Sequence, residues 1–107
     1  MSIKDLDDKG FDSVKKSDRA VVKFWADWCG PCHMLMPVFE AVSGKIKDVD
    51  FFSVNVDEAE ETAEEYSVMS IPTMILFEKG KEKDRIVGAS NEESLIEDIK
   101  QKFAIKD

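Results

Sequence analysis

The segment from residue 20 to residue 46 limits the possible folds of this chain more than any other feature of the sequence. Residues 20–26 form a short run rich in β-branched and aromatic side chains, interrupted only by Lys23, which is typical of a central strand buried on both faces. From Pro31 onward, apolar residues recur at helical spacing, and proline is well tolerated in the first turn of a helix. A buried strand that runs directly into an amphipathic helix predicts an α/β fold.

The rest of the chain extends this pattern. We expect a short strand near residues 2–6 and a helix over 7–17, with Phe11 and Val14 facing inward. A strand over 51–56, a helix over 59–66 and a strand over 73–77 should follow, and Lys79 and Gly80 should turn the last strand back into a hairpin partner around 85–87. A closing helix should be capped by Ser90 or Asn91. This order predicts a mixed central sheet, with parallel strands, a C-terminal antiparallel hairpin and helices on both faces.

Size and charge narrow the classes of function. The chain has 107 residues, of which 43% are hydrophobic, enough for a single domain over residues 1–107 with one core. Its 23 acidic and 15 basic residues give a formal charge of −8, which disfavours nucleic acids and anionic membranes as partners. The N-terminal residues lead into acidic side chains rather than a signal sequence, and no apolar run reaches membrane-spanning length. We therefore expect a monomeric cytoplasmic protein.

Cys29 and Cys32 are the only cysteines, and they lie where the expected strand meets the expected helix. A bond between them closes a very small loop, so it would constrain the unfolded chain little, and the cytosol disfavours structural disulfides. A zinc site is disfavoured too, because the two cysteines and the adjacent His33 need a fourth ligand for a tetrahedral set, and the sequence places none nearby. The start of a helix favours the thiolate of Cys29. Cys32 lies one turn further along the helix and should be more shielded from solvent. This geometry predicts reversible thiol–disulfide exchange.

The residues around the cysteines match a known family. The run Trp28-Cys29-Gly30-Pro31-Cys32 is the active-site signature of thioredoxins, and the sequence resembles that family along almost its whole length. Further landmarks in register are residues 24–26, Pro37, residues 55–57, residues 71–73 and the glycines at 80 and 88. The resemblance implies a thioredoxin-like fold and a protein-disulfide reductase without a bound cofactor. It also implies disulfide-containing client proteins and a separate reductase that recharges the enzyme.

The resemblance also assigns roles to individual positions. It implies that Cys29 is the nucleophile and Cys32 the resolving thiol. Trp28 resembles the residue that flanks the disulfide, and Trp25 the aromatic residue that packs beneath it. Pro72 resembles a cis-proline that faces the active site, and Ile71 a residue whose backbone binds an extended substrate segment.

The sequence departs from the family at two buried positions. Lys23 stands where thioredoxins usually carry an aspartate that is thought to handle the proton of the resolving cysteine, and Ser53 stands where they often carry a lysine. A charged Lys23 would favour the thiolates, whereas a neutral amine could accept the proton of Cys32. Alternatively, its side chain extends to the edge of the strand and has no chemical role.

Two other functions remain open for such a sequence. The same fold could form or isomerise disulfides, although Gly30 and Pro31 between the cysteines resemble the reducing members of the family. The chain could also be a non-catalytic binding module in which the thiols are incidental.

Overall fold

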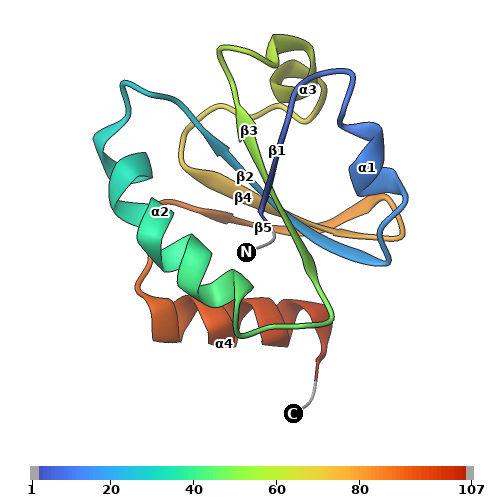
Figure 1. Ribbon diagram of the computed structural model, residues 1–107, viewed down its shortest axis with the longest axis vertical. Coiled ribbons are helices and arrows are strands. Elements are labelled where there is room, and N and C mark those ends of the chain that lie inside the picture. The colour runs from blue at the N-terminus through green and yellow to red at the C-terminus, as the bar shows by residue number, and fades with distance from the viewer. Residues whose placement is uncertain (1–2, 106–107) are drawn as a thin grey trace.

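The computed structural model describes residues 3–105 and contains five strands and four helices within that range. The chain alternates between strand and helix until its last third, where two strands follow each other directly (Figure 1). The elements are β1 (Lys4–Leu6), α1 (Asp12–Lys15), β2 (Arg19–Trp25), α2 (Gly30–Ser43), β3 (Asp50–Asn55), α3 (Glu60–Glu65), β4 (Thr73–Glu78), β5 (Lys81–Val87) and α4 (Glu92–Phe103). Residue 2 of the expected first strand lies outside the described residues.

The five strands form one mixed sheet in the order β1-β3-β2-β4-β5. β3 pairs in parallel with both β1 and β2, as the helical crossovers predict. β4 runs antiparallel to its hairpin partner β5 and also to β2. The antiparallel part of the sheet therefore includes the β2–β4 pair as well as the hairpin. The predicted mixed sheet is confirmed, and β2 is its central strand.

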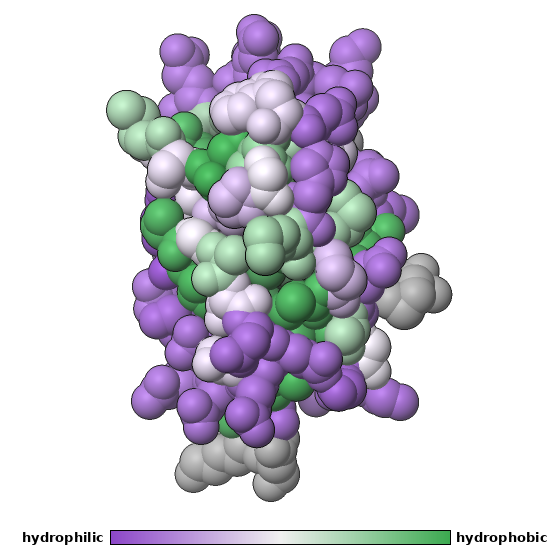
Figure 2. Space-filling model, turned by 90° about the vertical axis from the view of Figure 1, so that its left-hand side faces the viewer, coloured by the Kyte–Doolittle hydropathy of each residue, from purple (hydrophilic) through white to green (hydrophobic). Residues whose placement is uncertain are grey.

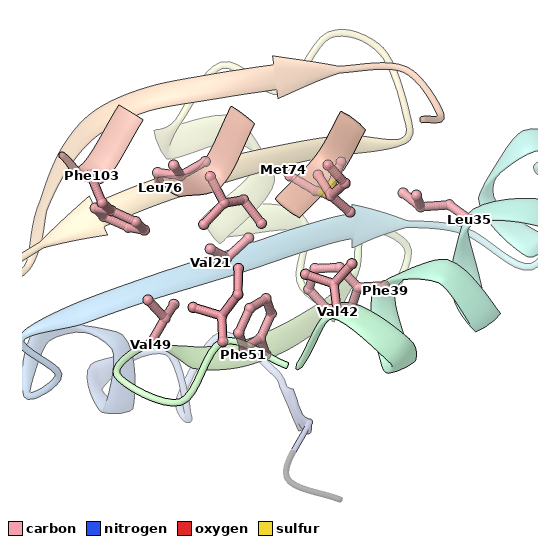
Figure 3. Close-up of a cluster of buried hydrophobic side chains, with 12 residues drawn as sticks. Val21, Leu35, Phe39, Val42, Val49, Phe51, Met74, Leu76 and Phe103 are labelled. Atoms are coloured by element: carbon pink, nitrogen blue, oxygen red, sulfur yellow. The ribbon is translucent and has the colours of Figure 1, made fainter. Parts of the chain in front are cut away.

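The helices cover both faces of the sheet (Figure 1). On one face, α2 and α4 pack on a buried cluster that includes Val21, Phe39, Met74 and Phe103 (Figure 3). On the other face, a second cluster joins residues next to α1 and α3 with the opposite side of β2. Alternate residues of β2 therefore enter different cores, which explains why its sequence is apolar without alternation.

The first helix is much shorter than the sequence pattern predicts. α1 spans only Asp12–Lys15, whereas the helical pattern suggested 7–17. The carboxylate Oδ1 of Asp7 accepts a hydrogen bond from the Gly10 N–H at 2.7 Å, which holds this segment in a turn that competes with helix. Phe11 and Val14 are nevertheless buried as expected, so the inward-facing residues are correct and the boundary is wrong.

The C-terminal hairpin is longer than expected. β5 spans Lys81–Val87, and Lys79 and Gly80 both have positive φ angles in the turn that precedes it. Residues 81–84 are charged and exposed, so they lack the apolar alternation by which a strand is found in sequence. The hairpin itself is confirmed, and its second strand begins four residues earlier than the pattern indicates.

The last helix closes the molecule against α2. The side chain of Asn91 accepts a hydrogen bond from the Ser94 N–H at 2.8 Å, so Asn91 is the N-cap of α4. Lys45, just beyond α2, pairs with Glu92 in the first turn of α4. None of the helices within residues 3–105 has the length and apolar character needed to cross a membrane.

Candidate active site

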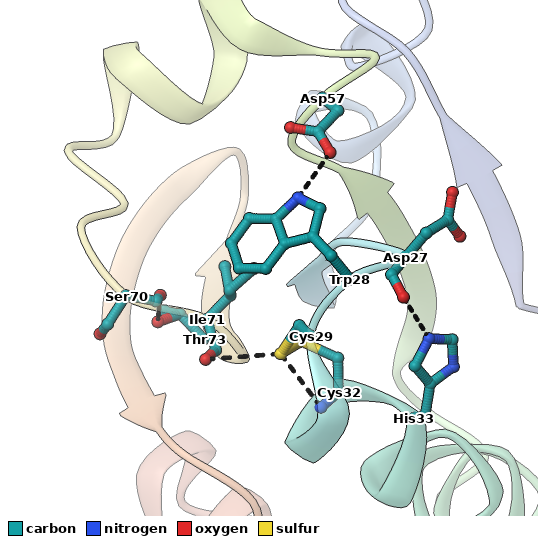
Figure 4. The surroundings of a disulfide bond; sticks show 9 residues. All are labelled: Asp27, Trp28, Cys29, Cys32, His33, Asp57, Ser70, Ile71 and Thr73. Atoms are coloured by element: carbon teal, nitrogen blue, oxygen red, sulfur yellow. Dashed lines mark hydrogen bonds between the residues drawn. A yellow bond between two sulfur atoms is a disulfide. The ribbon is translucent and has the colours of Figure 1, made fainter.

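Cys29 and Cys32 form a disulfide at the junction between β2 and α2 (Figure 4). Their Cα atoms are 5.3 Å apart, and Cys29 is the N-cap residue of α2. The Cys32 N–H donates a hydrogen bond to Sγ of Cys29 at 3.2 Å. The first sulfur therefore lies against the donors that a helix N-terminus leaves unpaired, as the sequence predicts.

The two sulfurs differ in their access to solvent. Cys29 is 6% exposed and Cys32 is 1% exposed, and together with Ala26 they form a small cluster against which Trp25 and Ile71 pack. Cys29 is thus the more accessible of the two, although neither side chain projects freely from the surface.

A loop before β4 faces the disulfide. The Ile71 carbonyl oxygen lies 3.8 Å from Sγ of Cys29, and the peptide bond between Ile71 and Pro72 is cis. A disulfide sulfur has no proton to donate, so the Ile71 contact becomes a hydrogen bond only when Cys29 is a thiol. The Pro72 carbonyl accepts a hydrogen bond from the Gly88 N–H at 2.8 Å, and Thr73 Oγ1 donates one to the Ser70 carbonyl at 2.6 Å. These bonds fix the loop beside the sulfur.

Trp28 is exposed, but its indole is held in place. Its Nε1–H donates a hydrogen bond to Oδ2 of Asp57 at 2.9 Å, at the end of β3 (Figure 4). The backbone N–H of Asp57 in turn donates to Oδ1 of Asn55 at 2.9 Å. In the sequence, Asp57 belongs to the landmark at residues 55–57, but no local pattern indicates its contact with Trp28.

Trp25 and His33 lie together near the disulfide. Trp25 is half-buried, and its ring meets the His33 ring edge-on with centroids 6.4 Å apart. His33 is exposed, and its Nε2 lies 2.7 Å from the Asp27 carbonyl oxygen. A carbonyl can only accept, so this contact places the proton of the ring on Nε2.

Lys23 is buried in the middle of β2, and its side chain is only 3% exposed. Its Nζ lies 5.1 Å from the ring centroid of Phe39 and 5.8 Å from that of Trp25. Burial lowers the pKa of Lys23, while the nearby carboxylates of Asp5 and Glu40 act in the opposite direction. The side chain thus points toward α2 and does not extend to the edge of the strand.

The part of the chain that the structure describes was also compared with the requirements of a metal site. Within residues 3–105, no three or more histidine, cysteine, aspartate or glutamate side chains gather closely enough to hold a metal ion.

The surface around the disulfide is partly apolar. Trp28, Met34 and Met69 are exposed large apolar residues, and Figure 2 shows apolar side chains gathered across the middle of the face that contains α2. A disulfide that caps a helix at the carboxyl end of a central strand, beside such a surface, defines a thiol–disulfide oxidoreductase.

Comparison with known proteins agrees with this class. Residues 2–101 match the family model described as thioredoxin. The chain is 42% identical over 99 residues to a thioredoxin from Chlamydia caviae, covering 92% of this chain and 97% of that protein. It is 44% identical over 98 residues to a thioredoxin from Staphylococcus epidermidis, covering 91% and 94%. A mutant thioredoxin from Halobacterium salinarum superposes with a TM-score of 0.88 at 30% identity, covering 99% of this chain and 95% of the other.

The chain belongs to the thioredoxin family. It has the thioredoxin fold and is a thiol–disulfide oxidoreductase with protein-disulfide reductase activity, as the sequence predicts. The family works with disulfide-containing client proteins and with a thioredoxin reductase.

Proposed function

We propose that Cys29 is the nucleophile and Cys32 the resolving thiol in the reduction of client disulfides. The observation that carries this assignment is the hydrogen bond from the Cys32 N–H to Sγ of Cys29 at the N-terminus of α2. In the reduced protein, that donor and the helix dipole favour the thiolate of Cys29, and the thiolate is the reactive form. The lower exposure of Cys32 supports its role as the second thiol.

The proposed reaction has two exchange steps. The Cys29 thiolate attacks one sulfur of a client disulfide, forming a mixed disulfide and releasing the other client sulfur as a thiolate. The Cys32 thiolate then attacks Sγ of Cys29, forming the Cys29–Cys32 disulfide and releasing the second client thiolate. The client gains two electrons, and the cysteine pair loses them. A separate thioredoxin reductase returns the electrons, so the protein itself needs no resident cofactor or metal.

The neighbouring residues support the docking of an extended client segment. A Cβ added at Gly30 would meet no atom within 4 Å, and Pro31 is exposed, so the surface beside Cys29 is open. We assign Trp28 to one side of the docking surface and Ile71 with Pro72 to the other, where the Ile71 backbone can bind the client's main chain. Trp25 supports the disulfide from beneath through its packing with the cysteines.

The remaining assignments follow from composition and size. We assign the whole chain, residues 1–107, to one thioredoxin-like domain that acts as a monomer in the cytoplasm. The charge of −8 supports proteins rather than nucleic acids or anionic membranes as partners.

The test is the reduction of a protein disulfide by the wild type and by the Cys29→Ser variant, with the electrons supplied by a small dithiol. Cys29→Ser should lose the activity, whereas Cys32→Ser should accumulate mixed disulfides that mass spectrometry identifies through Cys29. An unchanged rate for Cys29→Ser would favour the binding-module alternative and overturn the proposal. Equilibration with glutathione then tests direction, since a disulfide-forming enzyme would be mostly reduced under conditions in which a reductase is mostly oxidised.

A further inference from the structure

A cavity lies between α2 and the strands β1, β2 and β3. Its volume is about 290 Å³, and it is lined by Ile3, Asp5, Lys23, Trp25, Met36, Glu40 and Ser53. Lys23 belongs to the buried floor, whereas Asp5 and Glu40 are exposed at the rim. The cavity thus joins a buried amine to solvent past two carboxylates.

The sheet register explains how these groups meet. Asp5 on β1 is paired with Ser53 on β3, and Ser53 is paired with Lys23 on β2. Residues in register on neighbouring strands project from the same face, so these side chains form a row directed at α2. Ser53 is the small residue in the middle, which leaves space between the acid and the amine.

The amine of Lys23 has an unusual environment for a lysine. Within residues 3–105 it makes no ion pair or hydrogen bond, and its contacts are the faces of Trp25 and Phe39. Within residues 3–105, every fully buried side-chain nitrogen or oxygen atom has a hydrogen-bond partner. Because Nζ of Lys23 has no such partner, it is not fully buried and keeps some contact with solvent through the cavity. Burial lowers the pKa of this amine, whereas the two ring faces and the two carboxylates favour its ammonium form.

The same cavity leads along α2 toward the resolving cysteine. Cys32, Met36 and Glu40 are spaced by four residues on α2, so they lie on one side of the helix, and Met36 and Glu40 line the cavity. Trp25 lines the cavity as well and packs against the small cluster that contains both cysteines. Cys32 is therefore one helical turn beyond the wall of the cavity, separated from Lys23 by apolar groups.

We propose that the buried ammonium of Lys23 stabilises the Cys32 thiolate across this cavity, and that Asp5 and Glu40 at its rim moderate that effect. A buried charge is screened far less than an exposed one. The field at Cys32 is therefore dominated by Lys23, although the three charged groups sum to −1. Lys23 acts on Cys32 only through its charge, since it touches no reacting atom. The inference rests on the proposed role of Cys32 as the resolving thiol.

The consequence for the reaction concerns its second step. Cys32 must lose its proton to solvent before its thiolate can attack Sγ of Cys29, and a nearby cation makes that loss easier at neutral pH. Of the other titratable groups near Cys32, His33 is exposed and directed at the Asp27 carbonyl. This leaves Lys23, Asp5 and Glu40, which are the titratable groups that line the cavity.

The test is a titration of Cys32 in the Cys29→Ser background, followed by the ultraviolet absorbance of the thiolate. Lys23→Met should move the midpoint of thiolate formation upward by roughly one pH unit, because a nearby opposite charge has been removed. Lys23→Arg should restore the midpoint, since arginine keeps the charge and the cavity has room for its larger head group. Lys47→Met, which removes an exposed lysine, should leave the midpoint unchanged.

Variants of the two rim carboxylates provide a second, independent test of the inference. Asp5→Asn and Glu40→Gln should each move the midpoint of Cys32 downward, and Glu97→Gln, at an exposed site on α4, should not. Both rim residues are exposed, so these variants should fold even if Lys23→Met does not. In the protein that keeps both cysteines, a mixed disulfide can be formed on Cys29 and the rate of its resolution by Cys32 measured against pH. The midpoints of these rate profiles should shift in the same order among the variants.

The outcomes separate this inference from the proposed function. An unchanged midpoint in Lys23→Met, or in the Asp5→Asn and Glu40→Gln pair, overturns the inference whether or not the protein reduces disulfides. A shift in Lys23→Met that Lys23→Arg fails to restore also overturns it, since the charge would not be the cause. Loss of the proposed function shows itself separately, as an unchanged rate of client reduction in Cys29→Ser.

Discussion

The indole nitrogen of Trp28 donates a hydrogen bond to Asp57 Oδ2 at 2.9 Å, joining two exposed residues that lie 29 positions apart in the chain. The bond fixes the ring at the entrance to α2 against the end of β3 (Figure 4). An exposed aromatic ring held in this way keeps its conformation before a client arrives, which lowers the entropic cost of docking.

Replacing Trp28 by phenylalanine should therefore slow client reduction. The ring remains, but its donor is lost, and we expect kcat/KM to fall about fivefold, equivalent to about 1 kcal/mol. Asp57→Ala should act in the same direction, whereas Asp57→Asn keeps an acceptor oxygen and should lie near the wild type. Steady-state kinetics with a protein disulfide measure the effect, and equal rates for Trp28→Phe and the wild type would contradict it.

Asp8 should make folding stability depend on pH. Its Oδ1 accepts hydrogen bonds from the hydroxyl and the backbone N–H of Thr62, at 2.7 and 2.8 Å. The hydroxyl bond is the main reason why the pKa of Asp8 is lowered from 3.8. A lowered folded-state pKa stabilises the protein above pH 3.8, and this contribution is lost as the pH falls through the folded-state value.

The check is urea unfolding of Asp8→Ala and the wild type over a range of pH. The variant should unfold at lower urea concentration at pH 7, and the difference should vanish in strong acid. Asp48→Ala, at an exposed site, is the matched control. A difference that stays constant down to strong acid would show that the Asp8 carboxylate is not its source.

Gly80 and Gly88 should respond differently to substitution by alanine. Both have positive φ angles, of 84° and 94°, where a Cβ is strained. At Gly80 the new Cβ would also lie 3.3 Å from the backbone of Lys15, whereas at Gly88 it would meet nothing within 4 Å. We expect losses of about 2 kcal/mol for Gly80→Ala and about 1 kcal/mol for Gly88→Ala. Thermal unfolding should rank the two variants, and the reverse order would refute the steric argument.

Phe77 should be a major contributor to the core on the α1 and α3 side. It is fully buried, and its ring lies edge-on to Phe11 and Tyr66 with centroids 5.7 and 5.2 Å away. Phe77→Ala should cost about 3–5 kcal/mol of unfolding free energy. The variant should still reduce clients in its folded fraction, because the disulfide packs in a different cluster. Denaturant unfolding together with activity per folded molecule checks both statements.

Periodicity predicted the elements whose burial pattern is strong and local. Residues 20–46 show this, because the buried strand and the amphipathic helix each depend on side chains close in sequence. The same approach failed where side chains compete with the pattern. The Asp7 carboxylate holds a turn inside the expected first helix, and the charged residues 81–84 conceal the start of β5.

The disulfide was predictable because its two cysteines are near neighbours at a strand–helix junction. The surroundings of Trp28 and Lys23 were not, because Asp57 contacts Trp28 through the packing of separate elements, and strand register brings Asp5 into the same row as Lys23. Nothing in the local sequence of Lys23 indicates a cavity, since its walls come from three strands and one helix.

The outer strands of the sheet have a consequence for the behaviour of the protein at high concentration. β1 is only three residues long, and four successive charged residues, Lys81, Glu82, Lys83 and Asp84, line β5. A second molecule that approached β5 would have to desolvate these charges to continue the hydrogen-bond ladder, and one that approached β1 would find only three residues to pair with. The sheet is thereby protected against growth into fibrils, although its interior strands are strongly apolar.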